Sequence, residues 1–232
     1  MHNHIYEKLK KKIVHNVSKI MIPPPPPFDY LRHVSFFSHS LASLPSKYTG
    51  LDTNRLTLVH FCVHSLKMLN MLEYVLDKPA EGEEAGGVSR RKGIIAWVLN
   101  LLSLDPPTSI DANENARATA TFRGGTFSGR PFQTFSAATT IPRPRFNRYD
   151  FGHIAMTYTA LLTLHQLSTP TSHVSAILKS HSSPILNSLR PLQQPNGSFT
   201  ACTNGCGSES DMRFTFCAVA ICYLLGNNTF SR

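Results

Sequence analysis

One pattern occurs three times along this chain and constrains its fold more than any other feature. The segments Y-D-F-G-H-I-A-M-T-Y-T-A-L-L-T-L (149–164) and S-D-M-R-F-T-F-C-A-V-A-I-C-Y-L-L (210–225) both open with polar or turn-forming residues and continue as a mostly apolar run. A third copy is L-D-T-N-R-L-T-L-V-H-F (51–61). In every copy a polar residue stands five positions before a second side chain, the pairs being Asp52 and Thr57, His153 and Tyr158, and Asp211 and Phe216. Repeated helix-opening units are typical of repeat architectures, so we predict a cavity lined by helix N-termini.

The spacing of apolar residues predicts an all-α protein. Helical periodicity, ended by prolines, turn residues or polar inserts, covers 30–44, about 52–74, 93–104, the 149 region, 174–192 and 211–225. Asp52 or Thr53 is expected to cap the second of these helices, and Asp211 is better explained as an N-cap than as a catalytic carboxylate. Asn196-Gly197 predicts a turn. No region shows sustained strand alternation with hairpin turns.

Composition divides the chain into an extension and a globular part. Residues 1–27 form a basic stretch closed by five prolines, which favour a polyproline II spacer, while 28–232 carry the helical pattern. Two polar stretches, 77–92 and 108–148, are expected to be flexible inserts. Much of the net charge of +9 lies in the extension, which could bind an acidic partner, an anionic membrane or a phosphate group, or could simply be solvated.

Several classes of function are disfavoured by what the sequence lacks. The arginines of 108–148 are not interleaved with aromatic residues, which argues against nucleic-acid binding. No apolar run has the length of a membrane span, and no apolar h-region with a cleavage site opens the chain. The five cysteines lack a disulfide-framework spacing, and Cys202 and Cys206 have no second ligand pair for zinc. A reducing, cytoplasmic setting fits best.

Six separate segments, in the same order as in one known family, resemble the β subunits of protein prenyltransferases, most nearly those of the type I geranylgeranyl enzymes. They are R-H-V-S-F-F, L-D-T-N-R-L-T, F-R-G-G-T-F-S-G, Y-D-F-G-H-I-A-M-T-Y-T, L-Q-Q-P-N-G-S-F and S-E-S-D-M-R-F-T-F-C-A. The resemblance runs from about Tyr30 to Leu225. It implies an α-α toroid, as in terpenoid cyclases, in which alternating inner and outer helices surround a funnel that holds the isoprenoid.

The resemblance also implies an activity and partners. Such an enzyme transfers geranylgeranyl from its diphosphate to the cysteine thiol of a C-terminal CaaX sequence, in proteins such as small GTPases. It works as a heterodimer with an α subunit and uses zinc to activate the thiolate. These are expectations that the family brings to the chain.

Site residues follow from the same resemblance. Thr57 occupies the position where a farnesyltransferase carries a bulky Trp, so a small side chain there leaves room for a fourth isoprene unit. Tyr158 and Phe216 match aromatic positions of the isoprenoid channel, and Arg213 flanks the lipid. His153, Glu209 and Arg213 match the polar cluster that holds the CaaX carboxylate; their spacing also lets Glu209 orient Arg213 four residues later. The alternatives are core aromatics, a satisfied histidine and a surface ion pair.

The chain departs from the family at the zinc site. The family holds the metal with D-x-C and a later His, and no D-x-C occurs in this sequence. We therefore assign no catalytic or metal-binding residue within the chain and expect an incomplete barrel that is inactive alone, with zinc bound in the complete subunit. Two alternatives stay open: a non-catalytic interaction module derived from the toroid, and the β subunit of a farnesyl or Rab prenyltransferase.

Overall fold

A computed structural model describes residues 27–77, 89–105, 118–125, 152–169, 173–202 and 210–226. The chain divides into two compact units, Met1–Arg32 and His33–Arg232. Within the first unit the described residues are 27–32, where Asp29 accepts a hydrogen bond from the backbone N–H of Arg32 (3.1 Å) at the start of a helix. The predicted basic, proline-rich extension lies almost entirely outside the described residues, and Glu209 lies outside them.

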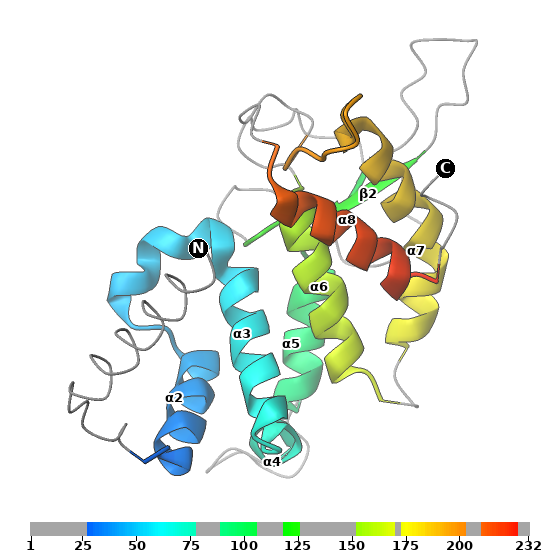
Figure 1. Cartoon of the computed structure of the whole chain (residues 1–232). Helices are drawn as coiled ribbons and strands as arrows, with labels where there is room; N and C mark the ends of the chain where they lie inside the picture. Colours follow the sequence, from blue (N-terminus) through cyan, green and yellow to red (C-terminus); the bar gives the residue numbers. More distant parts are fainter. Residues whose placement is uncertain are drawn as a thin grey trace, which may run out of the picture. The chain divides into compact units, whose positions relative to one another are not determined.

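The described part of the chain is mostly helical, as predicted (Figure 1). The α-helices are α2 (Tyr30–Ala42), α3 (Arg55–Met68), α4 (Leu72–Asp77), α5 (Arg90–Leu99), α6 (Ile154–Leu167), α7 (Val174–Leu189) and α8 (Met212–Leu224). Two short 3-10 segments, η1 (Ser46–Asn54) and η2 (Arg190–Leu192), adjoin α3 and α7. Two strands, β1 (Leu102–Asp105) and β2 (Thr119–Phe122), pair antiparallel with Leu102 opposite Phe122. No helix among the described residues has both the length and the apolar character that crossing a membrane requires.

Helix α6 is the centre of the second unit. It packs against α3 on one side and α8 on another, and it also contacts α5 and α7 (Figure 1). Ala160, Leu161 and Leu164 on α6 are almost completely buried. The main hydrophobic core joins them to residues of α3, α5, α7, α8 and both strands. A helix that is apolar on most sides can therefore be stable here because helices cover it on several sides.

Strand β2 fixes where α3 and α6 begin. The backbone oxygen of Phe122 accepts from the N–H of His153 (3.2 Å), and the N–H of Phe122 donates to the Thr157 hydroxyl (3.1 Å). Two residues after the end of β2, the backbone oxygen of Gly124 accepts a hydrogen bond from the N–H of Leu56 (2.8 Å). A Cβ at Gly124 would overlap the backbone oxygen of Thr53, so only glycine permits this close approach. Backbone groups left open at the helix starts are thus paired with the strand.

A second, smaller core lies where α3, α4 and α6 meet. Its buried members include Leu66, Leu72 and Leu167, and apolar residues of α2 such as Phe37 pack against it. The chain turns from α3 into α4 at Asn70, which has a positive φ of 53°. Asn adopts this conformation more readily than most residues, and the single helix predicted over about 52–74 is in fact two.

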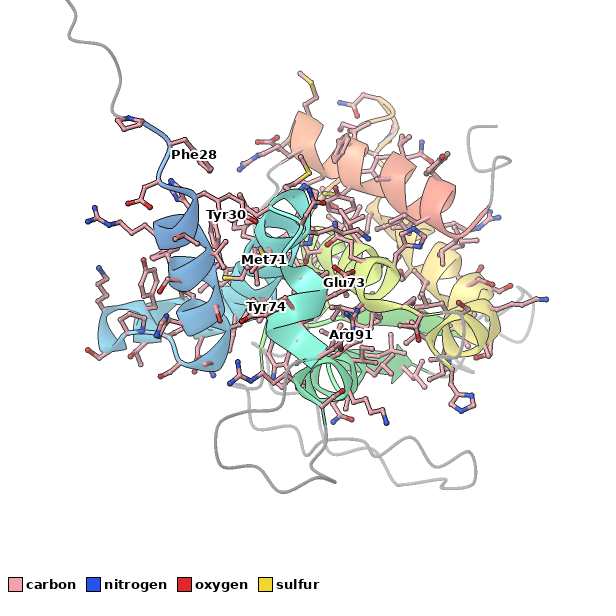
Figure 2. All side chains as sticks on the ribbon, turned by 90° about the horizontal axis from the view of Figure 1, so that it is seen from below. Phe28, Tyr30, Met71, Glu73, Tyr74 and Arg91 are labelled. Carbon is pink, nitrogen blue, oxygen red and sulfur yellow. The ribbon has the colours of Figure 1, made fainter. Side chains whose placement is uncertain are left out.

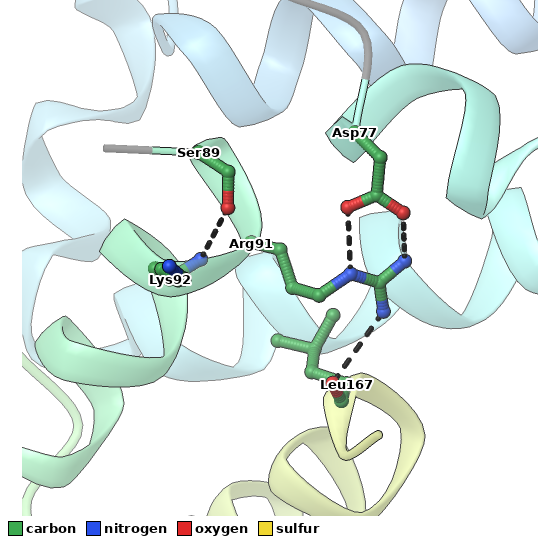
Figure 3. Close-up of polar contacts among 5 residues, drawn as sticks. All are labelled: Asp77, Ser89, Arg91, Lys92 and Leu167. Atoms are coloured by element: carbon green, nitrogen blue, oxygen red, sulfur yellow. Dashed lines mark hydrogen bonds and ion pairs between the residues drawn. The ribbon is translucent and has the colours of Figure 1, made fainter. Parts of the chain in front are cut away.

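One ion pair ties the ends of α4 and α5 to α6. The guanidinium of Arg91, a buried residue, donates from Nε and Nη2 to the two carboxylate oxygens of Asp77 (2.9 and 2.8 Å), and Nη1 donates to the backbone oxygen of Leu167 (3.4 Å) (Figure 3). Figure 2 shows Arg91 beside α4, which carries Glu73 and Tyr74. Arg91 is hydrogen-bonded to Asp77, and the charges of Asp77 and Glu73 act with that bond to raise its pKa. The ion pair therefore joins the last residue of α4, Asp77, to the first turn of α5.

The structure corrects two further local predictions. The helix predicted over 93–104 is α5, which starts earlier and ends at Leu99, and the residues after it form β1. The stretches 77–92 and 108–148, expected to be flexible inserts, lie mostly outside the described residues; the described parts include the start of α5 and strand β2. The cap predicted at Asp52 or Thr53 is also wrong: both lie in η1, and the N-cap of α3 is Asn54, without a side-chain cap hydrogen bond. Asp52 forms an ion pair with Arg55 instead (2.6 Å).

Candidate functional site

Two repeats begin their helices in the same way. At the start of α6, Nδ1 of His153 accepts a hydrogen bond from the backbone N–H of Ala155 (3.1 Å). At the start of α8, Oδ1 of Asp211 accepts from the backbone N–H of Arg213 (2.7 Å). Both side chains therefore cap a helix through the N–H two residues later, as N-cap residues do. The prediction that Asp211 is an N-cap is confirmed.

The capping role of His153 fixes the protonation of its ring. Because Nδ1 accepts a hydrogen bond, the neutral imidazole carries its proton on Nε2. Burial lowers the pKa of His153 from its ordinary value, which favours this neutral form. The ring meets Phe214 of α8 edge to face, with centroids 5.6 Å apart. His153 is thus a rigidly oriented group that joins the openings of α6 and α8.

Arg213 pairs with the cap of its own helix. Its Nη2 lies 2.8 Å from Oδ2 of Asp211, and 74% of its side chain is exposed to solvent. Hydrogen bonds from the side chain and backbone of Arg213 lower the pKa of Asp211. The predicted partner Glu209 lies outside the described residues. The structure therefore shows an exposed guanidinium held near the opening of α8 by Asp211.

The aromatic residues predicted for the site lie together. The rings of Tyr158 and Phe216 meet edge to face with centroids 5.5 Å apart. Tyr158 is half-buried, and burial raises the pKa of its phenol. Phe216 is 60% exposed although it lies among apolar neighbours on α8. Thr57 of α3 contacts α6 at Met156, since its hydroxyl donates to Sδ of that residue at 3.5 Å.

Helices α8 and α3 expose further apolar side chains that the sequence pattern did not predict as site residues. Val219 and Tyr223 are 64% and 78% exposed and follow Phe216 at helical spacing on α8. Phe61 of α3 is 57% exposed. An aromatic and aliphatic stripe of this kind suits a long hydrocarbon ligand or a packed partner better than a charged one. Its exposure could not be seen in the sequence, because α3, α6 and α8 are apolar on most sides.

A polar network lies between α3 and α6, close to this surface. The hydroxyl of Thr163 donates to the backbone oxygen of Thr159 (2.7 Å), so Nδ1–H of His60 must donate to that hydroxyl (3.2 Å). Burial, with a smaller effect of His64, lowers the pKa of His60 to about 4. His64 stacks on His60 at a centroid distance of 5.7 Å and lies 2.6 Å from the amide nitrogen of Gln166. His60 is therefore a buried, neutral hydrogen-bond donor.

The described residues do not fit a zinc site. They contain no group of three or more His, Cys, Asp or Glu side chains placed to hold a metal ion. Burial raises the pKa of Cys62 and Cys217 to about 11, so their thiols resist the deprotonation that metal binding requires. No step of a mechanism is assigned to zinc in this part of the chain.

Comparison with known families agrees with this architecture of paired helices. The family model described as the prenyltransferase alpha-alpha toroid domain matches residues 28–231, and the chain belongs to this family.

Individual relatives define the comparison further. The chain is 29% identical over 198 residues to the geranylgeranyl transferase type-1 subunit beta of Arabidopsis thaliana, covering 85% of this chain and 44% of that protein. It is 30% identical over 191 residues to the protein of that name from Dictyostelium discoideum, covering 82% and 47%. The chain thus spans about half the length of these relatives. A solved structure of Candida albicans protein geranylgeranyltransferase-I complexed with GGPP matches this chain with a TM-score of 0.54 and 18% sequence identity. The match covers 85% of this chain and 46% of that chain, and it shows a similarity of fold.

Proposed function

We propose that this chain forms part of the β subunit of a type I protein geranylgeranyltransferase. The observation that carries the proposal is the contact of the Tyr158 and Phe216 rings beside an exposed apolar stripe on α8. The small side chain of Thr57 contacts the same helix as Tyr158, at Met156. Two of the chain's relatives bear the name of that subunit. An apolar wall with aromatic rings suits an isoprenoid chain, because such a chain gains free energy by leaving water.

The polar groups at the helix openings have a separate proposed role. Neutral His153 can donate a hydrogen bond from Nε2, and exposed Arg213 supplies a positive charge near the start of α8. A peptide carboxylate is recognised well by such donors, directly or through water. We propose that these two residues, with Glu209, hold the C-terminal carboxylate of the CaaX substrate.

The rest of the reaction is proposed to depend on groups outside the described residues. Zinc would activate the substrate thiolate when bound, and no described cluster fits it. A prenyltransferase α subunit would complete the heterodimer, and the subunit would be cytoplasmic. This chain contributes walls that bind and orient the two substrates.

The test uses the complete product of the transcript that encodes this chain, coexpressed with a prenyltransferase α subunit. Transfer of labelled geranylgeranyl and farnesyl is measured to peptides that end in leucine or serine. We expect higher kcat/KM for geranylgeranyl diphosphate with the leucine peptide. A preference for farnesyl diphosphate, or for the peptide that ends in serine, would reject the type I assignment.

A second candidate is a non-catalytic module that binds the α subunit or the CaaX sequence. The lack of a metal-binding cluster among the described residues favours it. Stable binding of isoprenoid diphosphate and peptide, without transfer by the complete product in added zinc, would select this function.

A further inference from the structure

The side chain of Met156 on α6 is in direct contact with the side chain of Thr57 on α3. Met156 is the third residue of α6, only 8% of its surface is exposed, and its Sδ accepts the hydrogen bond from the Thr57 hydroxyl (3.5 Å). Threonine at a helix start has more than one rotamer available. The contact with Met156 selects the one in which the side chain at position 57 points toward α6.

The opposite side of Met156 is closed. A Cβ at Gly124 would come within 3.1 Å of Sδ of Met156 and would overlap the backbone of Thr53. The thioether therefore lies between the beginning of α3 and the chain that leaves β2. Met156 has no open space to move into on that side, because Gly124 is itself held by its hydrogen bond to the N–H of Leu56 (2.8 Å).

From this packing we infer that Met156 is a specificity-determining residue that sets, together with Thr57, the length of isoprenoid that the site accepts. The inference rests on the proposed function. A side chain larger than Thr at position 57 would have to share volume with Met156. Because Met156 is enclosed, the larger side chain is directed into the lipid channel and shortens it.

Truncation of the Met156 side chain to alanine provides the space that a larger side chain at position 57 lacks in the native protein. In a Thr57→Trp protein, the indole blocks the end of the channel and favours the shorter farnesyl donor. In a Thr57→Trp/Met156→Ala protein, the indole can turn into the volume that the thioether left, and the channel regains its length. The effect of the two substitutions is therefore coupled and not additive.

The experiment measures donor selectivity by binding. The complete subunit with its partner holds a fluorescent isoprenoid diphosphate, and geranylgeranyl or farnesyl diphosphate displaces it. The readout is the ratio of the two competition constants for the native protein, Thr57→Trp, Met156→Ala and the double variant. We expect Thr57→Trp to shift the ratio toward farnesyl by about tenfold or more, the range that small changes of pocket volume produce. The double variant is expected to recover most of that shift.

Three further variants control for effects other than the volume of the side chain at position 156. Met156→Leu keeps the volume and should leave the ratio in the Thr57→Trp background unchanged. Met156→Val opens a smaller space than Met156→Ala does. It is used in place of Met156→Ala if that variant does not fold. Met68→Ala, on α3 at a methionine that is 71% exposed, controls for the loss of a methionine.

The outcomes separate the two proposals. If Thr57→Trp leaves the ratio unchanged, the assignment of Thr57 in the proposed function fails. If Thr57→Trp shifts the ratio and the double variants show the same shift, the role of Met156 is overturned while that of Thr57 stands. Recovery by alanine or valine, with none by leucine, supports the inference.

Discussion

The rings of Tyr158 and Phe216 meet edge to face with their planes at 77°. Each residue stands five positions after the side chain that caps its helix, His153 for α6 and Asp211 for α8. Because the two helices begin in the same way, they carry their aromatic residues to the same level, and the rings can meet. The sequence repeat is therefore a repeat of helix capping in two of its three copies.

Phe216 is expected to serve ligand binding more than stability. Phe216→Ala removes a side chain that is 60% exposed, so the free energy of unfolding should fall by only about 1 kcal/mol, the contribution of the aromatic pair. Binding of geranylgeranyl diphosphate should weaken by about tenfold. Urea unfolding and fluorescence competition measure the two effects.

Phe214 supplies the matched control on the same helix. It is 8% exposed, and Phe214→Ala should lower the free energy of unfolding by about 3 kcal/mol or more. Equal destabilisation by both variants would show that Phe216 is a core residue, and the isoprenoid assignment would then lose its support.

Much of this architecture could be predicted from local patterns. Helical periodicity predicted a helix in the region of each of α2, α5, α6, α7 and α8, and one helix where α3 and α4 lie. The Asn196-Gly197 turn is present, with Gly197 at a φ of 84°. The cap at Asp211 was predictable because Asp is a favourable N-cap immediately before an apolar helix. The first copy of the repeat predicted a cap at Asp52 or Thr53, and this was wrong. The 3-10 segment η1 includes both residues, and α3 begins only at Arg55.

The strands could not be predicted because their pairing is non-local. Leu101, Leu102 and Leu104 continue an apolar helical pattern, yet Leu102 pairs with Phe122 across an intervening stretch of chain. The partner strand lies in a region rich in Ala and Thr, without a hairpin signal. The contact of Thr57 with Met156 was hidden for the same reason, since it joins two helices far apart in sequence.

The cysteines of α3 and α8 should be inert in the folded protein. Burial raises the pKa of Cys62 and Cys217 to about 11, so at pH 8 only about one thiol in a thousand is ionised. We expect iodoacetamide at pH 8 to leave both unmodified until urea unfolds the chain, as peptide mass spectrometry would show. Rapid labelling of Cys217 under native conditions would contradict its buried position at the α6–α8 contact.

The ion pair of Arg91 with Asp77 should stabilise the fold through its geometry. The Arg91 side chain is 11% exposed and that of Asp77 is 51% exposed, so Asp77→Ala leaves a mostly buried guanidinium without its carboxylate. We expect the free energy of unfolding to fall by about 2 kcal/mol. The hydrogen bond from Arg91 lowers the pKa of Asp77, so this contribution is present above the ordinary aspartate pKa and is lost as the pH falls through the folded value.

Replacement of the neighbouring arginine controls for the change in charge. Arg90 is exposed on the same helix, and Arg90→Met should change the urea midpoint far less than Arg91→Met does. A similar effect of the two substitutions would mean that the Arg91 contacts with Asp77 and Leu167 contribute little.

Acid should destabilise the protein through His60. Its pKa is about 4 in the folded chain, below the ordinary value of 6.5, because burial and His64 disfavour the charged ring. Between these two values the unfolded chain binds a proton that the folded chain does not. The free energy of unfolding therefore falls as the pH decreases from 6.5 toward 4 and is independent of this group above that window.

The size of this effect can be measured against a neutral replacement. From pH 7.5 to 5.0 the loss attributable to His60 is about 2 kcal/mol. His60→Gln keeps an N–H donor for Thr163 and cannot titrate, so it should remove that part of the pH dependence while lowering stability at pH 7.5. His39→Gln, at an exposed histidine of α2, should retain the native loss. If His60→Gln loses stability with acid as steeply as the native chain, His60 is not held neutral between α3 and α6.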